Sequence, residues 1–314
     1  MDEQASFLKN ADPRLPNFFL LGASKAGTTT LYALLRQHPE IYLPEIKEPH
    51  FFSNDYKYEK GINYYLSSYY SGAADYLARG DATPHYLFFE KAAERISHHL
   101  PLTHQRFIVI LRDPVSRAYS LYWNMVREGV EVNSFRRALE LEEERSKDSE
   151  IIKQGTVCIQ YVASSLYAAQ LNTYFRYFSH EQFLILLQED LACDPNAVMK
   201  EVFRFLGVQE DIRIRNTEPK NQAAGSRSVR LQRFLRKPHA LKHIVGRFLS
   251  ENAKYRIYSK LYKWNSSSFF YPPLEREVRQ QLYHRFRDDI LKLESLLGRN
   301  LRHWYDLSNN VEGI

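Results

Sequence analysis

Short apolar runs alternate along the chain with longer segments in which apolar residues recur at the spacing of a helix face. The runs predict β-strands at residues 17–23, 41–43, 106–111 and 183–187. Helical spacing predicts helices at 114–127, 158–178 and 274–297, and a further helix that begins after Pro195. Strands that alternate with helices are typical of an α/β fold with a central parallel sheet flanked by helices. We therefore predict this fold class.

Length and local changes in composition indicate one domain. The 314 residues are 44% hydrophobic, which is enough for one large core. We interpret residues 1–314 as a single domain, with an α/β core at about 15–215 and a basic, helical C-terminal part at about 226–305. The first residues are polar and acidic, and no apolar run approaches the roughly 18 residues of a membrane span. We therefore expect a cytoplasmic protein, at most peripheral to a membrane.

The residues after the first predicted strand combine glycine, lysine and hydroxyl side chains. The sequence from Gly22 to Thr30 is GASKAGTTT, and a helical pattern of leucines follows it. The first N–H groups of a helix have no acceptor within the helix, and with the helix dipole they favour an anion. The loop therefore predicts a phosphate site, with Lys25 adding positive charge and Thr28 and Thr29 adding hydroxyl donors. An ordinary strand-to-helix turn without a ligand is the alternative.

This P-loop-like segment differs from a nucleoside triphosphate loop in the place of its lysine. The pattern GxxxxGK[ST] has lysine directly after the second glycine. Gly22 and Gly27 have that spacing, but Thr28 stands at the lysine position and Lys25 lies in the middle of the loop. A lysine there suits a phosphate at the loop mouth better than a triphosphate. A P-loop kinase or NTPase is therefore the less favoured enzyme class.

A second motif follows the strand predicted at 106–111. Asp113 and Pro114 are typical of a helix N-terminus, where aspartate caps the backbone and proline loses no hydrogen bond. Arg112 leaves the strand at the sheet edge, and Ser120 lies two turns into the helix. A guanidinium and a hydroxyl that converge predict a clamp for a monophosphate. The alternative is an Arg112–Asp113 pair beside a serine on a solvated helix face.

Together, SKAGTT and the later RDPxxRxxSxY resemble the PAPS-dependent sulfotransferases, where PAPS is 3′-phosphoadenosine 5′-phosphosulfate. The resemblance is to the family shared by bacterial sulfotransferases and the sulfotransferase domains that modify heparan sulfate. Further similar segments are HPEI at 38–41, KEPHFF at 47–52, GDATPHY at 80–86, LYAAQL at 166–171, EDL at 189–191 and LGRNLRHWY at 297–305. These segments extend over nearly the whole chain. They are specific to the family and not to a substrate.

The resemblance implies which residues bind the donor. In this family the first loop binds the 5′-phosphosulfate and the second motif binds the 3′-phosphate. Arg112 and Ser120 would accordingly bind the 3′-phosphate, and Arg227 would close over the nucleotide. Lys25 would stabilise the leaving phosphate at the bridging oxygen. The N–H groups of Ala26, Gly27 and Thr28 and the hydroxyls of Thr28 and Thr29 would hold the 5′-phosphate, and Ser24 and Lys25 complete this predicted set.

The resemblance also implies the catalytic residues. Glu48 stands at the position of the family's catalytic carboxylate, and a carboxylate within about 3 Å of a hydroxyl is suited to act as a general base. The alternative is a surface glutamate paired with Lys47. His50 is the second candidate base, since histidine titrates near neutrality. PAPS would be the sulfuryl donor and PAP, its desulfated form, the product. We expect no metal, because Lys25 and backbone dipoles supply the positive field.

The acceptor is less defined than the donor. The resemblance and the many aromatic residues favour a hydroxyl, or an amine, of a carbohydrate such as a glycan or glycolipid. A small hydroxylated natural product or a lipid is the alternative. Heparan-modifying members carry a lysine where this chain has Ala82, so the wider bacterial branch is favoured. We expect acceptor contacts from variable loops at 53–70 and 129–156.

Positive charge is concentrated near the C-terminus. The net charge is +6, and the segment from Arg227 to Lys263 contains eleven Lys or Arg against one acidic residue, Glu251. This basic segment is either a solvated helix face or a surface for an anionic polymer or a membrane. A non-enzymatic binder built on it is the alternative function. We expect no nucleic acid as a partner, and the oligomeric state stays open. Cys158 and Cys193 are interpreted as buried free thiols.

Overall fold

The structure, a computed structural model, describes residues 12–100, 105–147, 159–215, 224–226, 228, 260–261, 264–268 and 271–306. Arg227, Cys158 and nearly all of the basic segment lie outside these residues. The predictions made for them therefore stay predictions.

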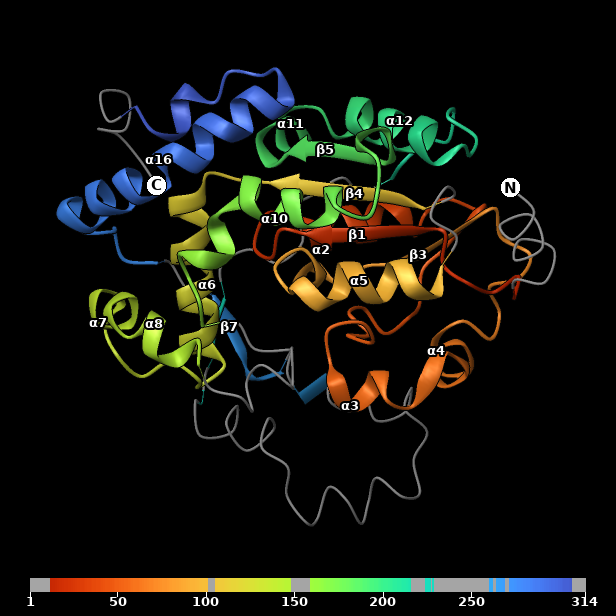
Figure 1. Cartoon of the computed structure of the whole chain (residues 1–314), viewed down its shortest axis with the longest axis horizontal. Coiled ribbons are helices and arrows are strands. Elements are labelled where there is room, and N and C mark those ends of the chain that lie inside the picture. The colour runs from red at the N-terminus through yellow and green to blue at the C-terminus, as the bar shows by residue number, and fades with distance from the viewer. Residues whose placement is uncertain are drawn as a thin grey trace, which may run out of the picture.

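Among the described residues, five parallel strands form a central sheet in the order β2-β3-β1-β4-β5 (Figure 1). The strands are β1 (Phe18–Gly22), β2 (Ile41–Tyr42), β3 (Ala78–Asp81), β4 (Arg106–Leu111) and β5 (Phe183–Leu187). From β1 the chain builds one side of the sheet with β2 and β3, then the other with β4 and β5. The carboxyl end of β1 therefore lies at the topological switch point, where open α/β sheets bind ligands.

Both faces of this sheet are covered, which explains the continuous apolar runs of β1 and β4. Successive side chains of a strand point to opposite faces. Phe19 and Leu21 accordingly pack in a core with α5 (Glu90–His99), α6 (Pro114–Arg127), α10 (Tyr167–Phe175) and α16 (Arg276–Leu297). Phe18 and Leu20 pack on the opposite face with α2 (Thr28–Leu35) and α12 (Pro195–Leu206). The helical C-terminal part is represented by α16, which completes the first core.

Shorter elements surround this framework (Figure 1). The helices are α3 (Asp55–Tyr58), α4 (Gly61–Tyr69), α7 (Phe135–Glu140), α8 (Glu142–Arg145) and α11 (Gln188–Cys193). The 3-10 turns are η1 (Pro84–Tyr86), η2 (Ala163–Ser165), η3 (His180–Gln182) and η4 (Arg302–Trp304). An antiparallel pair joins β6 (Ala224–Ser226) to β7 (Ser266–Ser268). No helix in the described part of the chain has both the length and the apolar composition needed to cross a bilayer.

Several sequence predictions differ from these elements. The periodicity of the chain does not predict β3, whose four residues include Arg79 and Asp81. The helix predicted at 158–178 is replaced, in its described part, by η2 and the shorter α10. The segments expected to be loops contain α3 and α4, and α7 and α8. Cys193, expected to be buried, is exposed at the end of α11, because the apolar face of that helix is formed by Leu191 instead.

Candidate active site

The loop between β1 and α2 lies at the carboxyl edge of the sheet. Ala23 N–H donates to Ile110 O at 2.6 Å, which ties the start of the loop to β4. Gly27 caps α2 with φ of 100°, a conformation that glycine adopts without a steric penalty. The N–H groups of Gly27 and Thr28 have no acceptor among the described residues. They are the donors that an anion at this helix start would meet.

Ala26 differs from its predicted role as an N–H donor to phosphate. Its N–H donates to Ala23 O at 3.1 Å and closes a turn within the loop. Its side chain is completely buried in the core with α5 and α6. Ala26 therefore shapes the loop, and the N–H groups of Gly27 and Thr28 remain for a ligand.

Lys25 extends from this loop toward α6. Its Nζ donates to Asn124 Oδ1 at 3.3 Å, and Arg127 Nη2 donates to the same oxygen at 2.6 Å. Burial and the positive charges of Arg127 and Arg112 together lower the pKa of Lys25 to about 8, while the charge of Glu48 opposes this shift. Lys25 thus lies within electrostatic reach of both predicted sites, the arginine after β4 and the carboxylate of the KEPHFF segment.

The motifs in the sequence do not indicate Asn124 or Arg127, although Asn124 Oδ1 accepts from both Lys25 and Arg127. They follow Ser120 by four and seven residues on α6, so the three positions share one helix face. A search of the predicted helix for polar residues on the same face as Ser120 would have identified them.

Arg112 directly precedes Asp113, the N-cap of α6, and Ser120 lies in the N-terminal half of that helix. Asp113 caps this helix by accepting from the N–H groups of Val115 and Ser116, both at 3.1 Å, so it is not the ion-pair partner of Arg112 that we considered. Among the described residues, the Arg112 guanidinium forms no hydrogen bond or ion pair, and the Ser120 hydroxyl forms no hydrogen bond. Both groups are therefore available to a ligand at this edge of the sheet.

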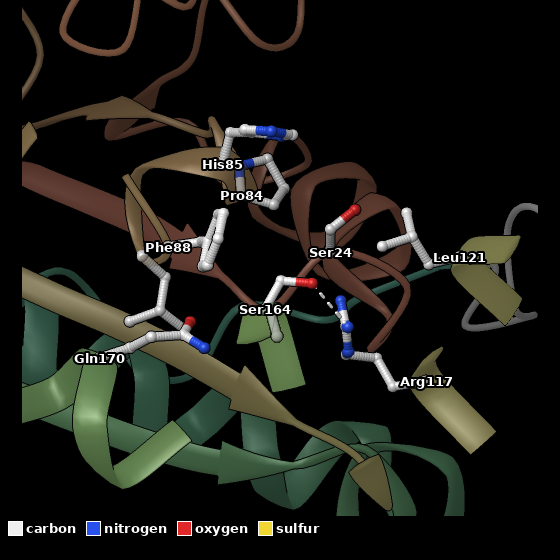
Figure 2. Close-up of a pocket in the computed structure, with 10 residues that line it drawn as sticks. Ser24, Pro84, His85, Phe88, Arg117, Leu121, Ser164 and Gln170 are labelled. Carbon is white, nitrogen blue, oxygen red and sulfur yellow. Dashed lines mark hydrogen bonds between the residues drawn. The ribbon is translucent and has the colours of Figure 1, made fainter. Parts of the chain in front are cut away.

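The second arginine of the RDPxxR motif has a different role. Arg117 is 1% exposed and donates to Ser164 Oγ at 2.8 Å and to Tyr161 O at 2.9 Å. It also donates to Ser165 Oγ, so it fastens α6 to η2. Figure 2 shows this arginine at one side of a small pocket that also has Ser24 and His85 in its wall. Neither Arg112 nor Ser120 lines this pocket, whose wall includes Ala23 and Ser24 of the first loop.

Glu48 and His50 lie on the segment between β2 and α3. Lys47 Nζ forms an ion pair with Glu48 Oε1, and His50 Nε2 lies 3.5 Å from Glu48 Oε2. Burial opposes ionisation of Glu48, but the charge of Lys47 and the contact with His50 outweigh it and lower its pKa. The carboxylate is therefore ionised at neutral pH, the form that a general base requires. The pair with Lys47 that we considered as an alternative is present, while the side chain is still 38% exposed.

A backbone property unites the three residues predicted to be catalytic. Among the described non-glycine residues, those with positive φ are Lys25 (70°), Glu48 (65°) and His50 (56°). This region costs an L-residue about 1 kcal/mol or more. Such residues cluster at functional sites, where the surrounding structure holds them in place. The strain therefore supports the selection of these three residues independently of any motif.

These features define an α/β domain with a glycine-containing loop between its first strand and the following helix. The model of the sulfotransferase domain family matches residues 15–237, and the chain belongs to this family. Membership of the PAPS-dependent sulfotransferase family and the α/β fold class are thereby confirmed. The domain bounds that we assigned from sequence stay a prediction.

Individual relatives include enzymes whose names state action on heparan sulfate. The chain is 28% identical over 296 residues to heparan sulfate glucosamine 3-O-sulfotransferase 3A1 of Mus musculus, covering 94% of this chain and 66% of that protein. It is 29% identical over 301 residues to bifunctional heparan sulfate N-deacetylase/N-sulfotransferase 4 of Mus musculus, covering 91% of this chain and 30% of the relative. The chain thus spans less than two thirds of the length of either protein.

A solved structure supports the fold. The sulfotransferase from Alicyclobacillus acidocaldarius is 28% identical and superposes with a TM-score of 0.67, covering 92% of this chain and 98% of that one. As for metals, the described residues contain no cluster of three or more histidine, cysteine, aspartate or glutamate side chains that could hold an ion.

Proposed function

We propose that this domain transfers a sulfuryl group from PAPS to a hydroxyl of a carbohydrate and releases PAP. The observation that carries the proposal is the placement of Lys25. It lies within electrostatic reach of both Arg112 and Glu48, and it is held by Asn124 on α6. A cation close to both a phosphate clamp and a carboxylate base is what sulfuryl transfer requires, because donor, leaving group and acceptor must meet at one point.

The proposed donor residues lie in the loop after β1, at the start of α2 and around the start of α6. The N–H groups of Gly27 and Thr28, with the dipole of α2 and the hydroxyls of Ser24, Thr28 and Thr29, bind the 5′-phosphate. Arg112 and Ser120 bind the 3′-phosphate, with the guanidinium supplying charge-assisted hydrogen bonds. The fit is supported by the absence of other hydrogen-bond partners for the Arg112 and Ser120 side chains among the described residues. The role proposed for Arg227 lies outside those residues.

The chemistry is an in-line displacement in which Glu48 and Lys25 have separate tasks. Glu48 accepts the proton of the acceptor hydroxyl, whose oxygen then forms a bond to sulfur. The bond between sulfur and the bridging phosphate oxygen breaks, and Lys25 stabilises the charge that this oxygen gains. The products are a sulfate ester and PAP. His50, 3.5 Å from Glu48, orients the carboxylate in this scheme and is the second candidate base.

A carbohydrate acceptor is supported by relatives whose names state action on heparan sulfate. The proposal does not require heparan sulfate itself. Ala82, which replaces the lysine of the heparan-modifying members, is 1% exposed and packs in the core with α2 and α12. The acceptor site of this chain therefore lacks a cation from that position, so other glycans or glycolipids are proposed first.

A transfer assay with sulfur-labelled PAPS and a panel of acceptors tests this function. The panel contains desulfated heparan sulfate, neutral glycans, glycolipids and small phenols, and we expect label in a carbohydrate. Transfer only to phenols would instead indicate a small natural product as the substrate. No transfer to any acceptor, with binding of an anionic polymer retained by Lys25→Ala and Glu48→Ala, would indicate the non-enzymatic binder.

The donor is tested separately by thermal unfolding. We expect PAP to raise the melting temperature more than ATP with Mg²⁺ does, since a ligand stabilises the state that it binds. Greater stabilisation by ATP with Mg²⁺ would favour the kinase class.

A further inference from the structure

Asp81, the last residue of β3, is a carboxylate buried in the core. Its exposed fraction is 0%. Tyr65 Oη donates to Asp81 Oδ2 at 2.7 Å, Tyr86 Oη donates to the same oxygen at 3.0 Å, and Thr83 Oγ1 donates to Oδ1 at 2.6 Å. Burial raises the pKa of Asp81, while these hydrogen bonds oppose the rise. Burying a carboxylate is costly even with such partners, so the position calls for a role beyond packing.

Two of these hydroxyl groups also contact the segment that carries Glu48. His50 N–H donates to Thr83 Oγ1 at 3.5 Å, and Phe52 N–H donates to Tyr86 Oη at 3.3 Å. A backbone N–H can only donate, so each hydroxyl oxygen must accept there and direct its own proton elsewhere. Asp81 accepts both protons. The carboxylate thereby sets the direction of both hydroxyl groups, which an amide with its own N–H donors could not do.

The segment needs this support because its backbone is strained. Glu48 and His50 have φ of 65° and 56°, and such conformations persist only where neighbouring groups hold them. Lys57 on α3 donates to Pro49 O at 2.5 Å, and Arg95 on α5 donates to Phe52 O at 3.1 Å. These two side chains hold carbonyl groups of the segment. The Asp81 network holds its N–H groups, at His50 and Phe52.

We propose that Asp81 is a positioning residue that acts through Thr83 and Tyr86 to fix the backbone at His50 and Phe52, and thereby places the Glu48 carboxylate at the reacting hydroxyl. The proposal rests on the function of Glu48 proposed above. It assigns a physical role to the GDATPHY segment, whose carboxylate, threonine and tyrosine act as one unit.

Thr83→Val tests the proposal with the smallest change, because valine keeps the shape of threonine and removes only its hydroxyl. We expect a kcat at least about tenfold lower, with the Kd of PAP within about twofold, since the donor residues lie on other elements. Thr83→Ser restores the hydroxyl and is expected to recover kcat to within about threefold. Asp81→Asn and Tyr86→Phe are expected to lower kcat in the same way.

Tyr174→Phe is the matched control. It also removes a buried hydroxyl from this core, one that donates to Tyr86 O at 2.7 Å, but that hydroxyl contacts no atom of the Glu48 segment. We expect it to change stability and leave kcat unchanged. A folded Thr83→Val protein with the kcat of the unsubstituted protein would overturn the proposal. Equal losses of kcat in Thr83→Val and Tyr174→Phe would show a purely structural role and would also overturn it.

Amide hydrogen exchange separates this proposal from the proposed function. The N–H groups of His50 and Phe52 are expected to exchange faster in the Thr83→Val/Tyr86→Phe protein than in Tyr174→Phe, whether or not an acceptor has been found. Unchanged exchange at both amides would reject the network as a positioning device even if sulfuryl transfer is established. Faster exchange of these amides in a protein that transfers no sulfuryl group would support the role of the network in holding the backbone, but would reject the proposed function.

Discussion

Lys25 Nζ donates to Asn124 Oδ1 at 3.3 Å, a hydrogen bond between the loop after β1 and the last turn of α6. The two residues are separated by 99 positions in the sequence, and the contact joins the loop predicted to bind the 5′-phosphate to the helix predicted to bind the 3′-phosphate. Because Arg127 shares the same oxygen, Asn124 brings two cations together. The protonation state of Lys25 therefore depends on this helix.

The pH dependence of kcat/KM is expected to follow the protonation of Lys25. Burial and the nearby arginines lower its pKa to about 8, so the ammonium is present below pH 8 and is lost as the pH rises through that value. We predict that kcat/KM for PAPS falls above about pH 8, by up to tenfold per pH unit. In Lys25→Arg we expect a lower kcat/KM that no longer falls at alkaline pH, because the guanidinium keeps its proton. An alkaline fall that persists in Lys25→Arg would assign it to another group.

Asn124→Asp is expected to shift the alkaline fall in kcat/KM to higher pH. A carboxylate in contact with Nζ favours the charged ammonium and raises its pKa by about 1 to 3 units, so the fall in kcat/KM should begin at least about one pH unit higher. Asn196→Asp is the control, since it adds the same charge to an exposed position of α12. An alkaline fall at the same pH in Asn124→Asp and in the unsubstituted protein would show that Asn124 does not contact the titrating group.

Arg112→Ala is expected to weaken binding of PAP and to leave binding of adenosine 5′-monophosphate nearly unchanged. Hydrogen bonds to a charged group contribute about 1.5–3 kcal/mol, so the Kd of PAP should rise roughly 10- to 100-fold by isothermal titration calorimetry. Ser120→Ala should give a smaller loss with the same selectivity.

Arg204→Ala is the matched control for Arg112→Ala, because it removes an exposed arginine of α12 that pairs with Glu210. Equal losses for the two nucleotides in Arg112→Ala would contradict a 3′-phosphate site at this arginine.

Gly80→Ala is expected to destabilise the fold. A Cβ at Gly80 would lie 2.1 Å from Cζ of the Phe18 ring, and that ring is completely buried. Overpacking of this kind costs about 1–3 kcal/mol or more, which urea unfolding would measure as a lower midpoint. In Gly72→Ala the new Cβ meets no atom within 4 Å, so a change below about 0.5 kcal/mol is expected. Equal midpoints for the two variants would show that β3 can move away from Phe18.

The strands that the sequence predicts are those whose stability depends on apolar burial. β4, β5 and α6 have the bounds that periodicity predicts, and β1 differs by one residue at each end. β3 could not be predicted in this way, because Asp81 is buried through hydroxyl donors that come from α4 and from the residues after the strand. Such a partner set is a tertiary property, and a four-residue window with a charged residue does not contain it.

The candidate site was predictable in part for a similar reason. Lys25, Glu48 and Arg112 belong to motifs with a recognisable spacing, and the structure adds the backbone strain at Lys25, Glu48 and His50. Left-handed φ at non-glycine residues leaves no signal in composition or periodicity. The turn that engages Ala26 N–H is likewise a property of the folded loop.

The central claim, that Glu48 is the base of a sulfuryl transfer, is tested most directly by the turnover of Glu48→Gln with labelled PAPS. Glutamine keeps the size of the side chain and removes its basicity. We predict a kcat lower by at least about 100-fold with the Kd of PAP within about twofold, and no change in the control Glu45→Gln, an exposed glutamate of the same segment. A kcat within about tenfold of the unsubstituted protein, a loss of less than about 1.4 kcal/mol, would contradict the account.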